Sequence, residues 1–581
     1  MNVALKQYWV LLAGYLRPQR LRVVVLAVLI FGGIGLELLN PQILRYFIDT
    51  ARAGGALSTL VVAAILFLGI ALAQQLLAVA ATYAGENVAW TATNLLRADL
   101  AAHCLRLDMS FHKSRTPGEL IERIDGDVNA LSNFFSQFAI GVVSNLVLLI
   151  GVLILLFRED WRVGAGLGIF AFVALFVLVR IRGFAVPYWD AVRDRDAAFF
   201  GFLSEQLAGT EDVRASGATG FVMRRFYEML RAWLPVQIKA GLAGATIWSS
   251  TIGVFAIGNA VAFALGAYLY RAGTITIGTV YLIFYYTELL RRPIEQFRTQ
   301  LQDLQKASAS IGRIEALFNT RSKVVDGPGQ LLPSGPLSVE FRDVSFGYDE
   351  DALVLQNVEF CLHPGKVLGL LGRTGSGKTT LARLLLRLYD PSRGEIRVGG
   401  VAIHAAHLHD LRRHVGIVTQ DVQLFNATVR DNLAFFNRSI SDERIIQSLD
   451  ELGLGAWYRT LPNGLDTELE SGGGGLSAGE AQLLAFVRLF LADPGLVILD
   501  EATARLDPAT EELIEQAVGK LLRNRTGIII AHRLPTVERA DEILILEHGS
   551  IIEHGRREHL ASDPTSHFVG LLRTGLHEVL A

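Results

Sequence analysis

One glycine-rich segment of this sequence has the residue types and spacing needed to hold a chain of phosphates. It is the run Gly372, Arg373, Thr374, Gly375, Ser376, Gly377, Lys378, Thr379, Thr380. Its glycines allow a tight turn that points backbone N–H groups at an anion, and a helix starting directly after the turn adds a favourable dipole. We expect Lys378 to reach the β- and γ-phosphates of a nucleoside triphosphate and the Thr379 hydroxyl to ligate Mg²⁺.

A pair of carboxylates further along the chain supplies the second half of such a site. Asp500 and Glu501 directly follow the apolar run Leu496–Leu499. Paired acids alone usually mark a solvated surface, but four apolar residues before them place this pair at the end of a buried strand. We expect Asp500 to hold the Mg²⁺ shell and Glu501 to polarise the water that attacks the γ-phosphate.

Both groups need a sheet to position them. The apolar run Val367–Leu371 has the length of a strand and leads into the glycine-rich turn, and Leu381–Leu386 continues as a helix. From about Leu337 onward, short strands rich in Val, Ile and Leu alternate with helices, which predicts an α/β domain around a largely parallel sheet. Just upstream, Pro and Gly punctuate residues 326–336, which is typical of a linker.

The composition indicates that the rest of the chain is too apolar, and carries too few charges, to be an ordinary soluble domain. Of the 581 residues 51% are hydrophobic and 19% are charged, whereas a soluble protein has about a quarter charged residues. The formal net charge of −3 and the lack of a polybasic tail give no indication of nucleic acid as a partner. Cys104 and Cys361 are expected to be ordinary thiols, and we expect no signal peptide.

Several apolar stretches before residue 300 are long enough to cross a membrane. They run approximately over Leu21–Leu39, Leu57–Tyr83, Gln137–Phe157, Val163–Ile181, Thr246–Tyr270 and Ile277–Leu290. The connections alternate between short turns and segments of about 50–65 residues that keep helical periodicity. This rhythm predicts six helices, with hairpins on one face and long helical extensions on the other. We therefore expect a transmembrane domain at 1–318, a linker at 319–336 and a nucleotide-binding domain at 337–581.

Positive charge distinguishes the two faces. The N-terminal segment and the two long extensions are rich in Arg and Lys, whereas the three hairpins together hold only Arg45, Arg52, Arg158, Arg162 and Arg271. Because positive charge stays on the inner side, both termini, the extensions and the nucleotide-binding domain are expected in the cytoplasm. The excess of Arg over Lys and the lack of a targeting sequence favour a bacterial plasma (inner) membrane.

The sequence resembles the ABC transporters of exporter fold across nearly its whole length. The resemblance implies that Tyr348, in Phe346-Gly-Tyr, stacks on adenine, and that Gln420 senses Mg²⁺ and couples to the membrane domain. It also implies that Ser477 and Gly479, in the signature Leu476–Glu480, cap the ATP held by an opposite subunit. Residues 502–507 resemble the dimer-contact loop of that family, and His532 matches its switch histidine on the γ-phosphate.

The membrane half carries the resemblance too. Phe111–Leu120 is similar to the first coupling segment of the family, and Glu205–Val213 is similar to the second. Both are expected at the tips of the long extensions. There they would convert cycles of ATP-driven closure into inward-facing and outward-facing states of the helices.

Three departures from the family pattern affect parts that act on the opposite subunit. Ala478 and Glu480 stand where the signature usually has Gly and Gln, the stretch 470–475 lacks a Glu-Arg pair, and the contact loop carries Ala504 and Arg505. A carboxylate at 480 should weaken capping of the partner's ATP unless the helix dipole screens it. We favour one subunit of a heterodimer, completed by a regular signature from a different partner, over a homodimer.

The predicted function is ATP-driven export of an amphipathic, lipid, peptide or drug-like substrate by alternating access. An importer on the same fold and an ATP-gated channel or regulatory subunit are the alternatives, and the apolar spans oppose a soluble ABC ATPase. Polar residues within or beside the spans are candidates for contacting substrate, although hydrogen bonding between helices is an equal explanation for the amides. These residues are Glu37, Gln74, Gln75, Asn259 and Glu288.

Overall fold

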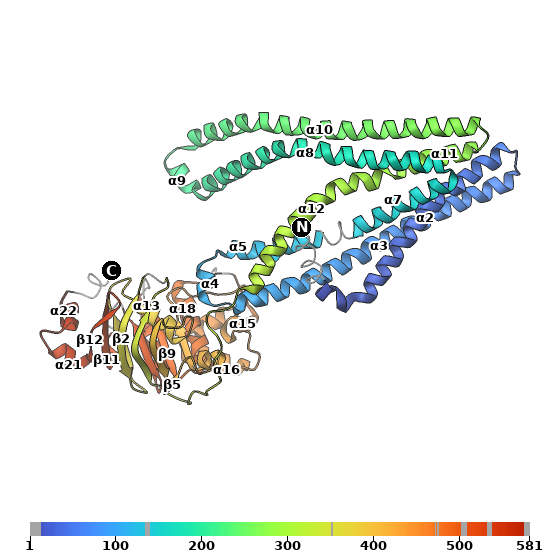
Figure 1. Cartoon of the computed structure of the whole chain (residues 1–581). Helices are drawn as coiled ribbons and strands as arrows, with labels where there is room; N and C mark the ends of the chain where they lie inside the picture. Colours follow the sequence, from blue (N-terminus) through green and yellow to red (C-terminus); the bar gives the residue numbers. More distant parts are fainter. Residues whose placement is uncertain are drawn as a thin grey trace. The chain divides into compact units, whose positions relative to one another are not determined.

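The computed structural model describes residues 13–133, 140–349, 352–470, 472, 476–500, 508–531 and 537–574. Its chain forms two compact units, each described here by itself (Figure 1). The first consists of Met1–Leu105 and Pro117–Thr320, and the second of Arg106–Thr116 and Arg321–Ala581. A short segment from the middle of the helical region therefore packs with the second unit.

The first unit is entirely helical. Its helices are η1 (Arg17–Gln19), α2 (Arg20–Arg52), α3 (Leu57–Arg106), α5 (Pro117–Ile121), the π-helical turn η2 (Glu122–Gly126), α6 (Asp127–Asn133), α7 (Ile140–Glu159), α8 (Trp161–Ala208), α9 (Thr210–Ala215), α10 (Thr219–Arg271), α11 (Ile277–Leu289) and α12 (Arg291–Asn319). The long helices α8 and α10 run side by side and are joined through α9 (Figure 1). This is the expected pattern of hairpins alternating with long helical extensions.

Five helices in the described part of the chain are long and apolar enough to cross a membrane. They are Ala13–Arg52, Leu57–Arg106, Gly141–Glu159, Trp161–Ala208 and Thr219–Arg271. The sixth expected span corresponds to α11, whose 13 residues rise only about 20 Å. Since α12 begins directly after Leu290, α11 and the first turns of α12 together have the length of a span.

An ion pair and several hydrogen bonds connect the helices at the hairpin ends of the spans. The Arg45 guanidinium of α2 contacts both carboxylate oxygens of Glu159 at the end of α7, at 2.6 and 2.7 Å. Asp49, one turn later on α2, accepts hydrogen bonds from the backbone of Gly278 at 2.9 Å and from the hydroxyl of Thr276 at 2.7 Å. The sequence pattern had identified Arg45 only as a hairpin charge. In the structure it helps to close this end of the bundle.

The second unit is built around two large sheets and one short strand pair. The larger has the order β12-β11-β3-β10-β9-β6, in which β12 is antiparallel to its neighbour and the other pairs are parallel. Its strands are β3 (Val367–Leu371), β6 (Val415–Val418), β9 (Leu496–Asp500), β10 (Thr526–Ile530), β11 (Glu542–Glu547) and β12 (Ser550–Arg556). Every residue of β3, β9 and β10 is buried, as expected for parallel strands covered on both faces.

The smaller sheet is antiparallel, with the order β2-β1-β4-β5. Its strands are β1 (Val339–Phe346), β2 (Leu355–Leu362), β4 (Arg393–Val398) and β5 (Val401–Ala402), and a separate pair joins β7 (Ala427–Thr428) to β8 (Glu468–Leu469). The accompanying helices are α4 (Met109–Lys113), α13 (Lys378–Leu385), α14 (Leu408–His414), α15 (Val429–Ala434), α16 (Asp442–Glu451), α17 (Gly455–Thr460), η4 (Gly464–Asp466), α18 (Ala478–Ala492), α19 (Pro508–Leu522), α21 (Arg557–Ser562) and α22 (His567–Thr574). The chain after residue 337 thus has the expected α/β architecture.

Asp108 holds the short helix α4 within the second unit. Its carboxylate caps α4 by accepting the backbone N–H groups of Ser110 and Phe111. It also accepts the Lys323 N–H and, at 3.2 Å, the Ser322 hydroxyl. One carboxylate therefore starts the helix and fixes it to the chain entering the sheet domain. No disulfide joins the two cysteines, of which Cys104 is buried and Cys361 is exposed.

Candidate nucleotide-binding site

The turn between β3 and α13 has backbone geometry that only glycine supplies. Gly372, Gly375 and Gly377 have φ of +147°, +84° and +106°, values that side-chain-bearing residues rarely adopt. An added Cβ at Gly372 would lie 2.2 Å from the Leu546 carbonyl oxygen, and one at Gly377 would lie 2.6 Å from Leu355 Cδ2. The sheet therefore leaves no room for a side chain at either position.

Lys378 and Ser376 line the inside of this turn. The Lys378 side chain is buried, and its ammonium donates to the carbonyls of Gly372 at 2.7 Å and Arg373 at 3.0 Å. The Ser376 hydroxyl is also buried, and the described residues offer it no hydrogen-bond partner. A buried hydroxyl without a partner is rare in a folded protein. A phosphate oxygen beside the ammonium would satisfy it.

Thr379 and Asp500 bring two oxygen ligands together. The Thr379 hydroxyl, in the first turn of α13, lies 3.3 Å from Asp500 Oδ2 at the buried end of β9. Among the described residues no group of three or more His, Cys, Asp or Glu side chains is placed to hold a metal by protein ligands alone. A pair of oxygens beside a phosphate loop instead fits Mg²⁺, which takes most of its ligands from phosphates and water.

Tyr348 lies beside the same turn with its ring held on several sides. Its hydroxyl is 3.1 Å from the Thr380 hydroxyl and accepts a hydrogen bond from Arg383 at 3.0 Å. Tyr389 packs edge-on against it at 5.1 Å between ring centroids. The Lys113 ammonium from α4 lies 4.0 Å from the centroid of its ring. Sequence reasoning missed this lysine because nothing in its local pattern links it to Tyr348.

Gln420 follows the strand next to Asp500. Strand β6 ends at Val418 and pairs in parallel with β9, so the two chains leave the sheet at the same edge. The Gln420 side chain is exposed. The neighbouring Thr419 hydroxyl donates to the Asp421 carbonyl at 2.9 Å. The sheet thus brings Gln420 and Asp500 to one edge, and any role of Gln420 toward Mg²⁺ stays a prediction.

Ser477 and Glu480 form a reciprocal cap at the start of α18. The Ser477 hydroxyl accepts the Glu480 N–H at 3.2 Å, and the Glu480 carboxylate accepts the Ser477 N–H at 2.8 Å. Both lie at the positive end of the helix dipole, where a carboxylate is stabilised. The unusual Glu480 therefore has a structural role within its own chain. The adjoining Gly479 is buried.

Part of the expected catalytic set cannot be placed. Glu501, His532 and the contact loop 502–507 lie outside the described residues. Arg373 and Thr374 are exposed on the outer side of the phosphate turn, and Thr380 is buried under Tyr348. The structure therefore brings Tyr348, Thr379 and Asp500 to the phosphate turn, whereas Ser477 and Gly479 lie at the start of α18, and the water-activating and switch residues stay predictions.

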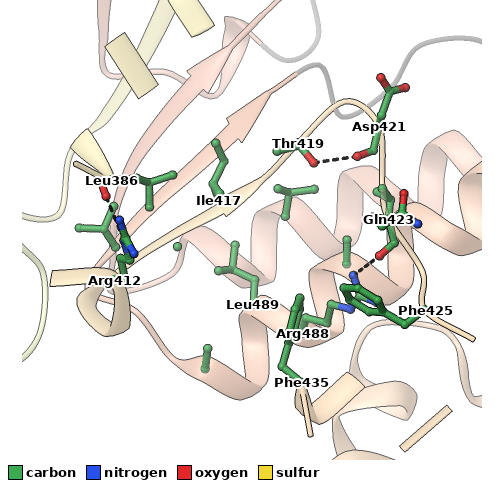
Figure 2. A pocket seen from close by; sticks show the side chains of 16 residues that line it. Leu386, Arg412, Ile417, Thr419, Asp421, Gln423, Phe425, Phe435, Arg488 and Leu489 are labelled. Carbon is green, nitrogen blue, oxygen red and sulfur yellow. Dashed lines mark hydrogen bonds between the residues drawn. The ribbon is translucent and has the colours of Figure 1, made fainter. Parts of the chain in front are cut away.

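A groove opens beside the segment that follows Gln420 (Figure 2). Its volume is about 420 Å³, and Ile417, Phe425, Phe435 and Leu489 lie along it. Arg488 also lines the groove, and its guanidinium donates hydrogen bonds to the carbonyls of Gln423 and Asn432 at 2.9 and 2.7 Å. Burial lowers the pKa of Arg488 to about 10, so it stays charged at neutral pH. The groove offers an apolar surface with a fixed cation next to the Gln420 loop.

Comparisons with known proteins agree with this geometry. Residues 23–294 match the model of the ABC transporter transmembrane region, and residues 355–504 match that of the ABC transporter. The uncharacterized ABC transporter ATP-binding protein YknV of Bacillus subtilis is 32% identical, with 95% of this chain and 92% of that protein covered. A fatty acid ABC transporter ATP-binding/permease protein of Mycobacterium bovis is 30% identical over 80% of this chain and 74% of its own length. A solved bacterial Atm1-family ABC exporter with ATP bound is 27% identical, with a TM-score of 0.77, covering 96% of this chain and 97% of the other.

Proposed function

Because this chain belongs to the ABC transporters, we propose how its particular residues divide the work of an ATP-driven exporter. The chain is an exporter-type subunit in which a helical membrane domain is fused to an ATPase domain, and it is a multi-pass membrane protein. ATP hydrolysis is coupled to transmembrane movement of substrate. The proposal concerns the residues that bind and hydrolyse ATP, the partner subunit, the orientation in the membrane and the substrate.

The arrangement around the phosphate turn carries the proposal. Lys378 and the unsatisfied hydroxyl of Ser376 face the space where phosphates would lie, and the glycines 372, 375 and 377 leave backbone N–H groups free to approach them. Tyr348 stacks on the adenine at the other end of the nucleotide. Thr379 and Asp500, with Gln420 at the same edge of the sheet, would hold Mg²⁺, which would supply charge that neutralises the β- and γ-phosphates.

Hydrolysis is assigned to residues that follow β9 and β10. Glu501 comes directly after Asp500 and accepts a proton from the attacking water, while His532 contacts the γ-phosphate after β10. Substituting Glu501 by Gln keeps the shape of the side chain and removes the base. This variant should bind ATP with unchanged affinity and lose steady-state hydrolysis by at least about a hundredfold.

The groove beside Gln420 is proposed to receive a coupling segment of the partner subunit. Helix α9 (Thr210–Ala215) has the length of such a segment and carries Glu211 and Asp212 in its first turn. If the partner's segment is acidic in the same way, its charge would complement Arg488, and the apolar rim at Phe425 and Phe435 suits the apolar face of a short helix. Closure of the ATPase domains would then be transmitted to the long helical extensions by the segment bound in this groove.

We propose that the partner is a different chain. In this subunit the residues that act on its own ATP follow the family pattern, whereas Ala478, Glu480, Ala504 and Arg505, which would act on the partner's ATP, depart from it. A partner with a regular signature would complete one fully active site. Purification from native membranes should therefore yield two chains in equal amounts. A symmetric dimer of this chain alone with full, cooperative ATPase activity would overturn the proposal.

The termini and the ATPase domain are proposed to face the cytoplasm of a bacterial cell, across the plasma membrane. Amphipathic molecules are the proposed substrate class, in keeping with the fatty acids named for one relative. The test uses inverted vesicles and a lipophilic fluorescent dye. ATP should drive dye into the vesicles, and Lys378→Ala should abolish both nucleotide binding and uptake. Uptake that persists without nucleotide binding would refute ATP-driven export. ATP-dependent flux that persists in Glu501→Gln would favour ATP gating instead.

A further inference from the structure

The membrane domain contains a pocket of about 650 Å³ among α2, α3, α7 and α12. Apolar side chains including Leu29, Ile30, Leu77 and Leu148 form much of its wall. A volume of this size suits a drug-sized molecule. Polar and charged residues line the rest of the pocket, among them the carboxylates Glu37 and Glu86 and the guanidinium of Arg292.

Four helices each contribute a polar residue at a similar depth. Glu37 on α2, Gln74 on α3, Asn145 on α7 and Arg292 on α12 all line the pocket. Counted along the chain, each is roughly 14 to 17 residues, or about 21–26 Å, from the hairpin end of its span. Since the hydrocarbon core is about 30 Å thick, this layer lies inside or just at the edge of the lipid.

Two of the charged residues that line the pocket, Glu37 and Arg292, lie in this layer. Neither Glu37 nor Arg292 makes a hydrogen bond or an ion pair within 4.0 Å among the described residues, although the two attract each other electrostatically. Asn145, by contrast, donates to Gln296. Glu288, another acidic residue in the spans, is bonded to Asn259 and does not line the pocket. An ionisable group at membrane depth without a partner is a strong indicator of function.

The pocket ends where the helices pack tightly. Beyond it toward the hairpin ends, Val152, Leu156 and Leu282 are fully buried in the core of the membrane domain. An added Cβ at Gly151 of α7 would lie 2.7 Å from Leu38 Cδ1 of α2, so these helices touch. The Tyr286 hydroxyl donates to the Leu38 carbonyl at 2.9 Å in the same region. A molecule in the pocket is therefore stopped at the polar layer on its hairpin side.

We propose that this pocket binds an amphipathic zwitterion, with its ammonium group on Glu37 and its anionic group on Arg292. The amides of Gln74 and Gln75 are available to hydrogen-bond the polar part, and the apolar walls take the rest of the molecule. This inference rests on the proposed export function and names the class of its substrate. A hydrophobic peptide with free termini and an aminophospholipid share this chemistry.

The probes are three forms of a diphenylalanine peptide: one with free termini, one N-acetylated and one C-amidated. Their binding to the full chain is measured in nanodiscs of phosphatidylglycerol without ATP. Because a hydrogen bond to a charged group contributes about 1.5–3 kcal/mol, each capped form should bind roughly ten- to hundredfold more weakly than the free peptide.

Variants assign each charge to its partner. In Glu37→Gln the acetylated and free peptides should bind alike, because the ammonium group no longer has a counterion. In Arg292→Gln the amidated and free peptides should bind alike. Glu288→Gln is the matched control and should keep the full discrimination. Adding phosphatidylethanolamine to the nanodiscs distinguishes a lipid substrate from a peptide substrate. If the lipid competes with the peptide for binding, an aminophospholipid is favoured, and if it does not compete, a peptide is favoured.

Equal binding of all three peptides to the unmodified chain would overturn this inference, as would discrimination that survives both substitutions. Destabilisation by both variants with unchanged peptide preference would assign Glu37 and Arg292 to an ion pair within the protein instead. ATP binding and its loss in Lys378→Ala are measured on the same preparation. If ATP binding and its loss in Lys378→Ala are as expected but the chain binds all three peptides equally, only the proposed substrate class is wrong and the export function stands.

Discussion

The Lys113 ammonium lies 4.0 Å from the centroid of the Tyr348 ring, on the side chain expected to stack on adenine. Lys113 belongs to α4, which overlaps the predicted first coupling segment Phe111–Leu120, and Asp108 fixes that helix to the chain entering the ATPase domain. The cation therefore lies over one face of the ring. An adenine that stacks on this face has to displace Lys113.

We predict that adenine displaces Lys113. A cation–π contact at a partly exposed site contributes about 0.5–1 kcal/mol. Lys113→Ala should therefore bind ATP roughly two- to fivefold more tightly, measured by titration with a fluorescent ATP analogue. Lys113→Arg retains a cation and should bind like the unmodified chain. If Lys113→Ala binds ATP more weakly, the lysine instead contacts the bound nucleotide.

Gly377→Ala should abolish nucleotide binding through crowding at the phosphate turn. Its φ is +106°, and the added Cβ would lie 2.6 Å from Leu355 Cδ2. Gly400→Ala is the matched control, because Gly400 has φ of +78° and nothing within 4 Å of an added Cβ. Both variants should lose about 1–3 kcal/mol of stability from backbone strain. Calorimetry and ATP titration together should show lost binding in Gly377→Ala alone.

Glu480→Gln should raise ATP turnover without loss of stability. Glutamine at this position maintains the reciprocal cap with Ser477, so the free energy of unfolding should change by less than about 0.5 kcal/mol. Removing the negative charge should strengthen capping of the partner's ATP, and hydrolysis by the assembled complex should rise several-fold. Glu480→Ala should lose about 0.5–1.5 kcal/mol because the cap is broken. Unchanged turnover in Glu480→Gln would show that the helix dipole already screens the carboxylate.

The attachment of the first coupling segment should depend on pH through Asp108. Burial by itself raises the pKa of this carboxyl, but hydrogen bonds from the Ser110 side chain and the backbone of Lys323 and Phe111 outweigh it and lower the pKa overall. The folded chain is therefore stabilised by the ionised form above the unfolded value of about 4. That contribution is lost as the pH falls below about 4 through the lowered folded value.

Hydrogen exchange of residues 106–116 measures this attachment. Protection factors should fall in acid for the unmodified chain, and Asp108→Asn should show the same low protection already at neutral pH. Glu443→Gln, which alters an exposed carboxylate on α16, serves as the control and should leave the segment protected. Equal protection in Asp108→Asn and the unmodified chain would show that Phe111 and its apolar contacts hold the segment without the carboxylate.

Short-range sequence patterns were sufficient to predict the phosphate turn and the general architecture. The glycines at 372, 375 and 377 were assigned from spacing alone, because a tight turn between strand and helix imposes those φ angles whatever the rest of the chain does. The helical spans and the alternation of strands and helices followed from hydrophobic periodicity for the same reason. Of the six predicted spans, the sixth corresponds to a helix, α11, that has only 13 residues before the chain continues as α12.

Pairings between distant residues were decided only by the tertiary structure. The sequence indicated Glu37 as a polar residue within or beside a span and did not single out Arg292, and only helix packing lines one pocket with both. In the same way, Glu480 was in the sequence only a departure from the signature, and the structure shows that it caps α18 together with Ser477. Nothing in the sequence linked Lys113 to Tyr348. Local propensity fixes φ, ψ and which face of a segment is apolar. Which side chains meet across the fold depends on how whole elements pack, and no short window of sequence contains that information.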